Sequence, residues 1–167
     1  MKQFFLSITF IFISICYLTG QHTTILKFDG VNDYVDVGNQ AGNNLRTLEL
    51  WFQPIQNIDS TNSQFRSLFI RNTSNQFDEV FLYFVPTFQT TNPGAGRLSF
   101  GYNLSSTFDY QVQSDANQWE EGIWYHVAGV IDPVEGIMLF INGVKQQETN
   151  PSTTATNTSI QSSRIGG

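Results

Sequence analysis

Short runs of alternating apolar and polar residues recur along the chain from residue 24 onward, and turn-forming residues separate them. A period of two is typical of β-strands that bury one face, whereas an amphipathic helix has a period of 3.6, which no run here shows convincingly. About ten short strands in one all-β domain are therefore expected. The expected strands are 24–28, 34–38, 47–55, 66–72, 79–85, 97–103, 109–113, 123–131, 137–141 and 144–148.

The clearest alternation lies in TLELWFQPI, residues 47–55. Its two leucines and Phe52 share one face of the predicted strand and should lie in the core, which leaves Glu49, Trp51 and Gln53 on the opposite face. By contrast, EVFLYFV at 79–85 is apolar on both faces, as expected for a central strand that is covered on both sides.

Asn142-Gly143 lies between the apolar-alternating segments IMLFI and VKQQE. Both central residues of the tightest hairpin turn need positive φ, which Asn and Gly tolerate best, so this pair predicts a hairpin. Together with IWYHVAGVI and the DPVEG turn before it, the hairpin should complete a three-strand antiparallel meander. The Ser/Thr/Asn-rich stretch 149–163 that follows is predicted to be a loop with nothing to pack.

The first twenty residues are typical of a secretory signal peptide, with Lys2 followed by an apolar stretch and small residues at the end. As a helix, the apolar stretch would span about 22 Å, short of the ~30 Å hydrocarbon core, so cleavage after Gly20 is predicted, with an uncleaved anchor as the alternative. The remaining domain, 21–167, would be secreted or lie at the cell surface without inserting into the membrane. It would have no cysteine, because Cys16 is removed, and would depend on burial alone for stability.

Charged residues make up 13% of the chain and the formal net charge is −6. A nucleic-acid-binding protein needs clustered Lys and Arg, and the few basic residues here are scattered singly, so nucleic acid is not expected as a partner. Three Asn-x-Ser/Thr sequons are candidate N-glycosylation sites, or chance matches in a chain rich in these residues. They begin at Asn72, Asn103 and Asn157.

Six segments occur in order along residues 24–167: LKFDGVNDYVDVG, TLELWFQP, GRLSFGY, GIWYHVAGVID, IMLFINGVKQ and RIGG. Their order and spacing resemble the laminin-G-like domain of the concanavalin A-like lectin and glucanase superfamily. The resemblance implies a two-sheet antiparallel jelly-roll β-sandwich. Family members usually continue after the Ile-Gly segment into one more strand, which would lie beside the first. The domain is therefore expected to lack its final C-terminal strand here, as a fragment of a longer protein with an unpaired edge near TILKF.

Glucanases of this superfamily carry two carboxylates alternating on one strand, about 5 Å apart. This chain has no Glu-x-Asp or Asp-x-Asp pair, and its adjacent acidic pairs at 78–79 and 120–121 would point to opposite faces of a strand. The Gly-x-Ser-x-Gly elbow of serine hydrolases is absent, and His22 and His126 lie too far apart in sequence to suggest zinc. His126 is predicted to be hydrogen-bonded inside the sandwich. No catalytic residue is predicted in this chain, and the question stays open for a longer parent protein.

Asp29, Asn32, Asp33 and Asp36 offer the hard oxygen ligands that calcium prefers, and the resemblance includes relatives that hold calcium at a sandwich rim. The alternative is that Asp-Gly and Asn-Asp are simply good turn formers at a strand junction. Too few of the six to eight oxygens that calcium needs are visible, so a calcium site is one of two open interpretations and no cofactor is assigned. The DPVEG turn at 132–136 is a weaker second candidate.

Glu49, Trp51 and Gln53 form the candidate ligand-binding face, because an indole can stack on a sugar ring while polar neighbours bind its hydroxyls. The alternative is that a neighbouring loop covers Trp51, and the polar loops at 72–76 and 90–96 are equally plausible binding sites. The predicted function is a secreted, non-catalytic module that binds an extracellular glycan or a protein partner. An accessory domain of a secreted glycoside hydrolase and a structural module of a large adhesin stay open, because fold does not fix function. Nothing in the pattern indicates the oligomeric state.

Overall fold

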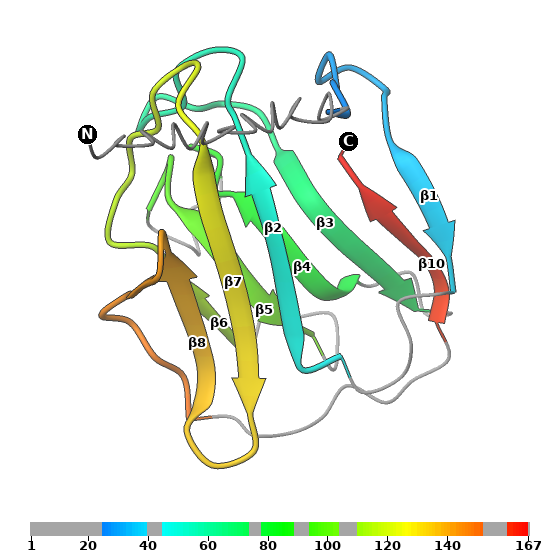
Figure 1. The fold of residues 1–167 in the computed structure, drawn as a ribbon, viewed down its shortest axis with the longest axis vertical. Coiled ribbons are helices and arrows are strands. Elements are labelled where there is room, and N and C mark those ends of the chain that lie inside the picture. The colour runs from blue at the N-terminus through cyan, green and yellow to red at the C-terminus, as the bar shows by residue number, and fades with distance from the viewer. Residues whose placement is uncertain are drawn as a thin grey trace, which may run out of the picture.

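Two antiparallel sheets pack face to face in the computed structural model of the chain (Figure 1). The structure describes residues 25–39, 45–73, 78–88, 94–103, 110–151 and 160–166. The predicted signal segment, 1–20, lies outside these ranges. Within them, no helix has the length and apolar character needed to cross a membrane. The all-β, two-sheet sandwich predicted from the alternation is confirmed, and its form is consistent with a jelly roll.

The larger sheet has six strands and the smaller has four. In spatial order the larger sheet contains β1 (Val35–Gly38), β10 (Ile160–Ile165), β3 (Arg66–Thr73), β4 (Asp78–Phe84), β5 (Leu98–Tyr102) and β6 (Tyr110–Gln113). The smaller sheet contains β2 (Thr47–Phe52), β7 (Tyr125–Asp132), β8 (Gly136–Ile141) and β9 (Val144–Lys145).

The core lies between the sheets, and a cluster of aromatic rings fills one part of it. The ring centroid of Phe52 lies 5.6 Å from those of Phe84 and Trp119 and 5.4 Å from that of Tyr125. The buried Trp119 indole donates a 2.8 Å hydrogen bond from Nε1 to the Gly96 carbonyl, so its polar atom is satisfied. Apolar contact between rings from both sheets therefore holds the two layers together.

The central strand β4 is buried on both faces, as its sequence predicted. Val80 and Phe84 join the core between the sheets, whereas Phe81, Tyr83 and Val85 form a separate buried cluster. The sheets also approach closely where Gly129 on β7 meets a ring of β5: a Cβ atom at Gly129 would lie 2.4 Å from Cδ2 of Phe100. A side chain at this glycine would push the layers apart.

The predicted meander is confirmed as β7–β8–β9, with Asn142 and Gly143 in the second turn at φ of 50° and 78°. The Asn142 side chain also stabilises this turn, because its Oδ1 accepts a 2.9 Å hydrogen bond from the His126 backbone N–H. The Asn142 N–H in turn donates to the His126 carbonyl at 2.9 Å. Asn142 thus extends the pairing with β7 one residue past the end of β8.

Two predicted segments differ from the structure. Residues 25–28 were expected to be a strand but form none, and Ile25 and Leu26 are 56% and 63% exposed. Residues 149–163 were expected to be a loop, yet β10 begins at Ile160 and pairs with β1 on one side and β3 on the other. A strand needs a hydrogen-bonding neighbour. The polar sequence IQSSRI lies between two strands, whereas the more apolar TILKF pairs with none of the described strands. Whether a further strand follows Gly167 stays a prediction.

Candidate functional site

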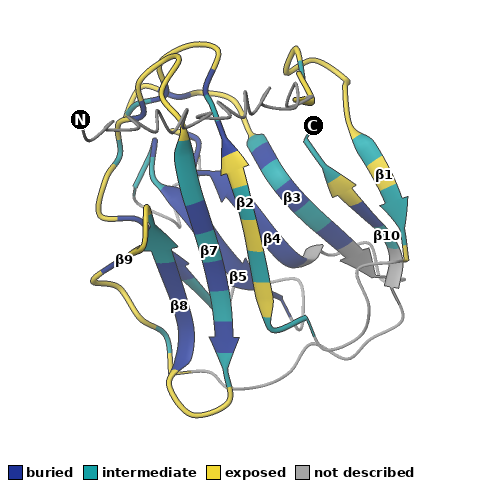
Figure 2. Ribbon diagram, in the orientation of Figure 1, coloured by how far each residue is buried: buried dark blue, intermediate teal, exposed yellow. Residues whose placement is uncertain are grey.

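The outer face of the four-stranded sheet carries an exposed tryptophan. Along β2 the residues are alternately more and less exposed, with Leu50 and Phe52 turned to the core and Glu49 and Trp51 turned to solvent (Figure 2). The alternation predicted for this strand is therefore confirmed. Trp51 is 64% exposed although it lies in a regular ladder with β7, one residue before the end of β2. The neighbouring-loop alternative, in which Trp51 would be buried, does not hold.

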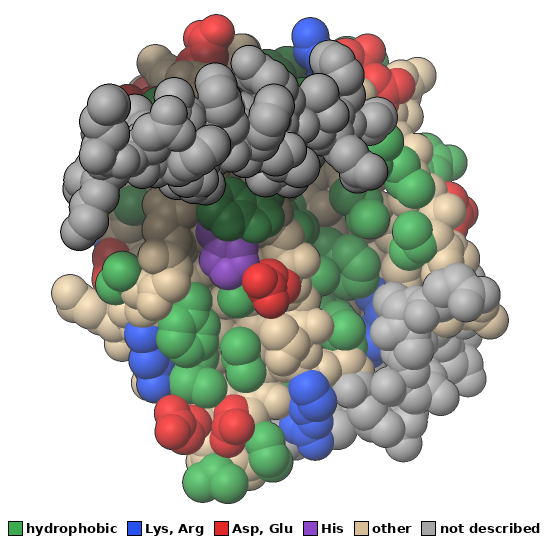
Figure 3. Space-filling view, in the orientation of Figure 1, with side chains coloured by type: hydrophobic (Ala, Val, Ile, Leu, Met, Phe, Trp, Pro, Cys, Tyr) green, Lys and Arg blue, Asp and Glu red, His purple; other side chains and the backbone are tan. Residues whose placement is uncertain are grey.

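The antiparallel register places His126 of β7 directly opposite Trp51. Their ring centroids are 5.0 Å apart with the planes inclined at 48°. His126 Nε2 lies 2.8 Å from Glu49 Oε1, so a hydrogen bond joins the imidazole to the carboxylate. Figure 3 shows this face, where a histidine and an acidic side chain touch one another among hydrophobic side chains. An indole, an imidazole and a carboxylate thus form one contiguous patch, which we call the Trp51 patch.

The prediction that His126 lies inside the sandwich is wrong. Tyr125 and Val127 pack into the core, and the period of two therefore turns His126 outward. The hydrogen bond expected for this histidine does exist, but its partner is Glu49 on the outer face. The apolar set Val127, Gly129 and Ile131 could have given the correct face from sequence, because it is the more consistently core-like of the two alternating sets of β7.

Gln53, the third predicted ligand residue, has a structural role. It follows β2, is partly buried, and donates a 2.7 Å hydrogen bond from Nε2 to the Gly122 carbonyl. This bond ties the end of β2 to the turn that precedes β7. One residue before β7, Trp124 is 44% exposed, and strand alternation puts it on the same face as His126.

The Trp51 patch combines features that suit a ligand with both apolar and hydroxyl surfaces. The indole offers a flat apolar face, and the Glu49 carboxylate, whose side chain is 62% exposed, accepts hydrogen bonds. The His126 side chain is 20% exposed, so it supports Glu49 more than it faces solvent. All three residues lie on two strands that are paired in register. The backbone of the site is therefore ordered before a ligand binds, which lowers the entropy cost of binding.

The acidic residues predicted as calcium ligands are engaged in turn hydrogen bonds. Asp29 and Asp36 each accept from the backbone N–H two residues further on, at 2.8 and 2.7 Å, and Asp33 accepts from the N–H of Asp29 at 3.2 Å. Asn32 is exposed. In the part of the chain that the structure describes, no three or more His, Cys, Asp or Glu side chains group to hold a metal ion. These contacts favour the turn interpretation, and a calcium site stays a prediction.

Asp132, in the DPVEG turn, is also a turn former. The backbone N–H groups of Glu135 and Val134 donate to its Oδ1 at 2.8 and 2.7 Å. These hydrogen bonds, Glu135 first, lower the pKa of the Asp132 carboxyl below its ordinary value of 3.8, and the charge of Arg46 adds to the effect. The carboxylate therefore closes the β7–β8 turn.

The sequons occupy different environments. Asn103 follows β5 and is only 9% exposed, which is a poor position for a bulky glycan. Asn72 lies on β3, and Asn157 is outside the described residues. Glycosylation of these asparagines stays a prediction.

A family model described as the concanavalin A-like lectin/glucanases superfamily, of the laminin-G type, matches residues 29–167. The match covers most of the chain and includes every strand of both sheets. No curated protein matches the chain.

Proposed function

Because the chain belongs to the laminin-G domain family of the concanavalin A-like lectin/glucanase superfamily, we propose that it is a secreted module that binds carbohydrate at the Trp51 patch without cleaving it. The exposed indole of Trp51 is the observation that supports this proposal. Large apolar side chains are usually buried, and an exposed aromatic on a rigid strand is typical of a contact surface.

The polar groups around the indole match the chemistry of a sugar. A pyranose has an apolar face of C–H groups, which can stack on Trp51, and hydroxyls at its edge, which can donate to Glu49. Glu49 is fixed by His126, so it would meet the ligand in one orientation. Trp124 offers a second aromatic surface on the same face for a neighbouring sugar unit.

Binding is favoured over hydrolysis by the neighbours of Glu49. Glycoside hydrolysis ordinarily uses two carboxyl groups about 5 to 9.5 Å apart. The residue opposite Glu49 on β7 is Ala128, and the diagonal neighbours are His126 and Val130, so β7 brings no second carboxylate to this carboxylate. A protein partner could use the same exposed surface. A role as an accessory domain of a glycoside hydrolase, or as a module of an adhesin, would place this binding module in a longer protein.

The test is a glycan array followed by calorimetry, using the full chain produced in a secreting host. We expect a saturable signal with at least one glycan. Replacing Trp51 by Ala should weaken that binding by roughly thirtyfold, as expected for loss of a central aromatic contact. Val134→Ala is the matched control, because Val134 is 85% exposed in the β7–β8 turn, at the opposite end of β7 from His126. No binding to any glycan, or equal binding by Trp51→Ala, would overturn the proposal.

A further inference from the structure

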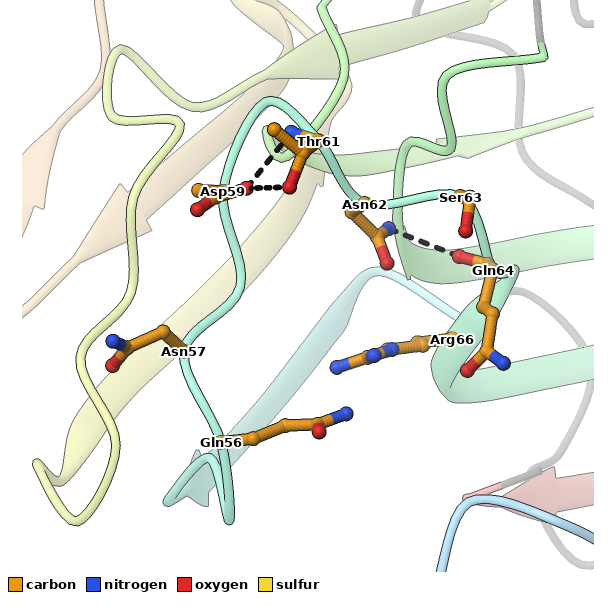
Figure 4. Close-up of a pocket in the computed structure, with 8 residues that line it drawn as sticks. All are labelled: Gln56, Asn57, Asp59, Thr61, Asn62, Ser63, Gln64 and Arg66. Carbon is orange, nitrogen blue, oxygen red and sulfur yellow. Dashed lines mark hydrogen bonds between the residues drawn. The ribbon is translucent and has the colours of Figure 1, made fainter.

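A second, chemically different site lies in the loop that joins β2 to β3. This loop, together with the first residue of β3, lines a pocket of about 320 Å³ in which every side chain is polar (Figure 4). A pocket of this volume is at the small end of the range for ligand sites, about 300–1,000 Å³. The lining residues are Gln56, Asn57, Asp59, Thr61, Asn62, Ser63, Gln64 and Arg66.

Asn62 is the residue that points to a ligand. It is only 7% exposed, and three of its four polar groups are bonded: the side-chain Nδ2 donates to the Gln64 carbonyl at 2.9 Å, the backbone N–H donates to the Asp59 carbonyl at 3.0 Å, and its carbonyl accepts from Thr87 at 2.8 Å. The fourth, Oδ1, is buried and has no hydrogen-bond partner. Figure 4 shows this oxygen turned toward the side of the pocket where Arg66 lies. A buried acceptor without a donor is uncommon in native proteins, and a donor from a bound ligand would satisfy it.

Arg66 brings a positive charge to the same space. The Gln56 amide, turned with its oxygen toward the guanidinium, accepts from Nη1 at 3.0 Å and from Nη2 at 2.6 Å. Among the described residues no carboxylate forms an ion pair with Arg66. A guanidinium has five N–H donors, so donors beyond those bonded to Gln56 remain for a ligand in the pocket.

Asp59 supplies the opposite charge. Its Oδ1 accepts from the Thr61 hydroxyl at 2.6 Å and from the Thr61 backbone N–H at 2.8 Å. The hydroxyl first, then the N–H, lower the pKa of the Asp59 carboxyl below its ordinary value, so it is ionised near neutral pH. The second oxygen, Oδ2, can accept from a ligand.

The core of the sandwich holds the loop in place. Ile58 and Trp119 exchange two backbone hydrogen bonds, at 3.0 and 2.8 Å, which tie the loop to the central buried indole. Asn57 Oδ1 accepts from the Glu121 N–H at 2.8 Å on one side. A Cβ atom at Gly96 would lie 2.4 Å from the carbonyl carbon of Asp59, so the backbones are in close contact there. The pocket is therefore preformed, which lowers the entropy cost of binding.

The lining chemistry selects the class of ligand. An anion would meet the Asp59 carboxylate and the bare Asn62 oxygen, and a cation would meet Arg66. A neutral ligand that both donates and accepts satisfies all three groups, and the other lining side chains are neutral amides and hydroxyls. We infer that this pocket binds a single neutral monosaccharide unit by hydrogen bonds alone, with its hydroxyls bridging Arg66, Asn62 and Asp59. The choice of a sugar over other neutral polar molecules rests on the proposed function, but the location of the site does not.

The test uses ¹⁵N-labelled full chain and follows amide signals during titration with glucose, galactose, mannose and N-acetylglucosamine, each added separately. Glycine is the zwitterionic probe and sodium sulfate the anionic one. We expect at least one sugar to shift the Asn62 side-chain amide and the Gln64 backbone amide saturably, and glycine and sulfate to leave both unmoved.

Arg66→Met and Asp59→Asn test the site without removing Asn62, which also holds the loop through Nδ2. Each variant should weaken the sugar-dependent shifts by about tenfold or more, because a hydrogen bond to a charged group is lost. Lys145→Met is the matched control for Arg66→Met, since it removes an exposed cation on β9 of the other sheet. It should leave the shifts unchanged.

Trp51→Ala separates this site from the Trp51 patch. If the pocket exists, its signals still shift in Trp51→Ala, whatever happens at the patch. Sugars that leave the Asn62 and Gln64 signals unmoved, shifts produced by glycine or sulfate instead, or shifts that survive in Arg66→Met would each overturn the inference. If the Asn62 and Gln64 signals shift as expected but no sugar shifts the indole N–H signal of Trp51, the proposed function is contradicted and the inference about the pocket still holds.

Discussion

Trp51 and Trp119 are the same residue type in the same sandwich, and they have opposite environments. Trp119 is 1% exposed, surrounded by Phe52, Phe84 and Tyr125, and its indole N–H is hydrogen-bonded. Trp51 is 64% exposed and contacts only the His126 ring among the aromatic side chains described. The buried indole joins the sheets and the β2–β3 loop, whereas the exposed one leaves its face open. The contacts of Trp119 therefore stabilise the fold, and Trp51 is the tryptophan to which we assign recognition under the proposed function.

The largest expected effect is the difference in free energy of unfolding between alanine substitutions of these two tryptophans. Trp119→Ala should lower the free energy of unfolding by about 3–5 kcal/mol, because it leaves a cavity among three rings and removes the contacts of a large buried side chain. Trp51→Ala should change it by no more than about 0.5 kcal/mol, since the side chain is already mostly hydrated. Urea unfolding followed by far-ultraviolet circular dichroism would measure both. Equal losses for the two variants would contradict the division of roles.

An intermediate effect should distinguish the two faces of β7. Gly129→Ala should destabilise the fold by about 1–3 kcal/mol, because the added methyl group would overlap the Phe100 ring of the opposite sheet. Ala128→Ser, at the adjacent outward position, should stay within about 0.5 kcal/mol. The same urea titration checks the pair. A neutral Gly129→Ala variant would mean that the sheets can separate at this point without loss.

The smallest effect should be the acid sensitivity of the β7–β8 turn on the surface. The native pKa of Asp132 is lowered by the N–H groups of Glu135 and Val134, so the unfolded chain binds its proton more readily. The stabilisation is therefore present above the ordinary pKa of 3.8 and is lost as the pH falls through the lower native pKa. As the pH falls below this pKa, the stability of Asp132→Asn should therefore decrease less steeply than that of the native chain.

Thermal unfolding measured between neutral pH and pH 2 would show this difference. Glu120→Gln is the control, because it removes an exposed carboxyl from a different turn. Identical pH dependence in the native chain and Asp132→Asn would show that the hydrogen bonds of this turn do not couple to folding.

Much of the fold could be predicted because alternation and turn chemistry are local. The inward and outward faces of β2, the two buried faces of β4 and the Asn142-Gly143 turn all follow from residues close in sequence. The failures were of another kind. The segment 25–28 has strand-like alternation but pairs with no strand in the part of the chain that the structure describes, and β10 is polar but lies between two neighbours. Local pattern states a preference, and available hydrogen-bond partners decide the outcome.

The candidate sites show the same limit. The outward face of Trp51 was predictable from the sequence, but its exposure and the partner of Glu49 were not, because loop coverage was left open and His126 lies 77 residues away. The polar loop between β2 and β3 gave no signal at all. Its pocket depends on the bonds of Ile58 to Trp119 and on the buried Asn62 amide.

The alternation of apolar and polar residues was enough to predict the period of two and the core-facing side chains of β2 and β4, although the face of His126 on β7 was predicted wrongly. The sequence also determined where the chain turns, because positive φ and side-chain capping depend on single residues. Only the tertiary structure decided which strands became neighbours, that an imidazole would fix Glu49 beside an open indole, and that Asn62 would face Arg66. Pairing across long sequence separations depends on register and packing summed over both sheets, and no local pattern contains that sum.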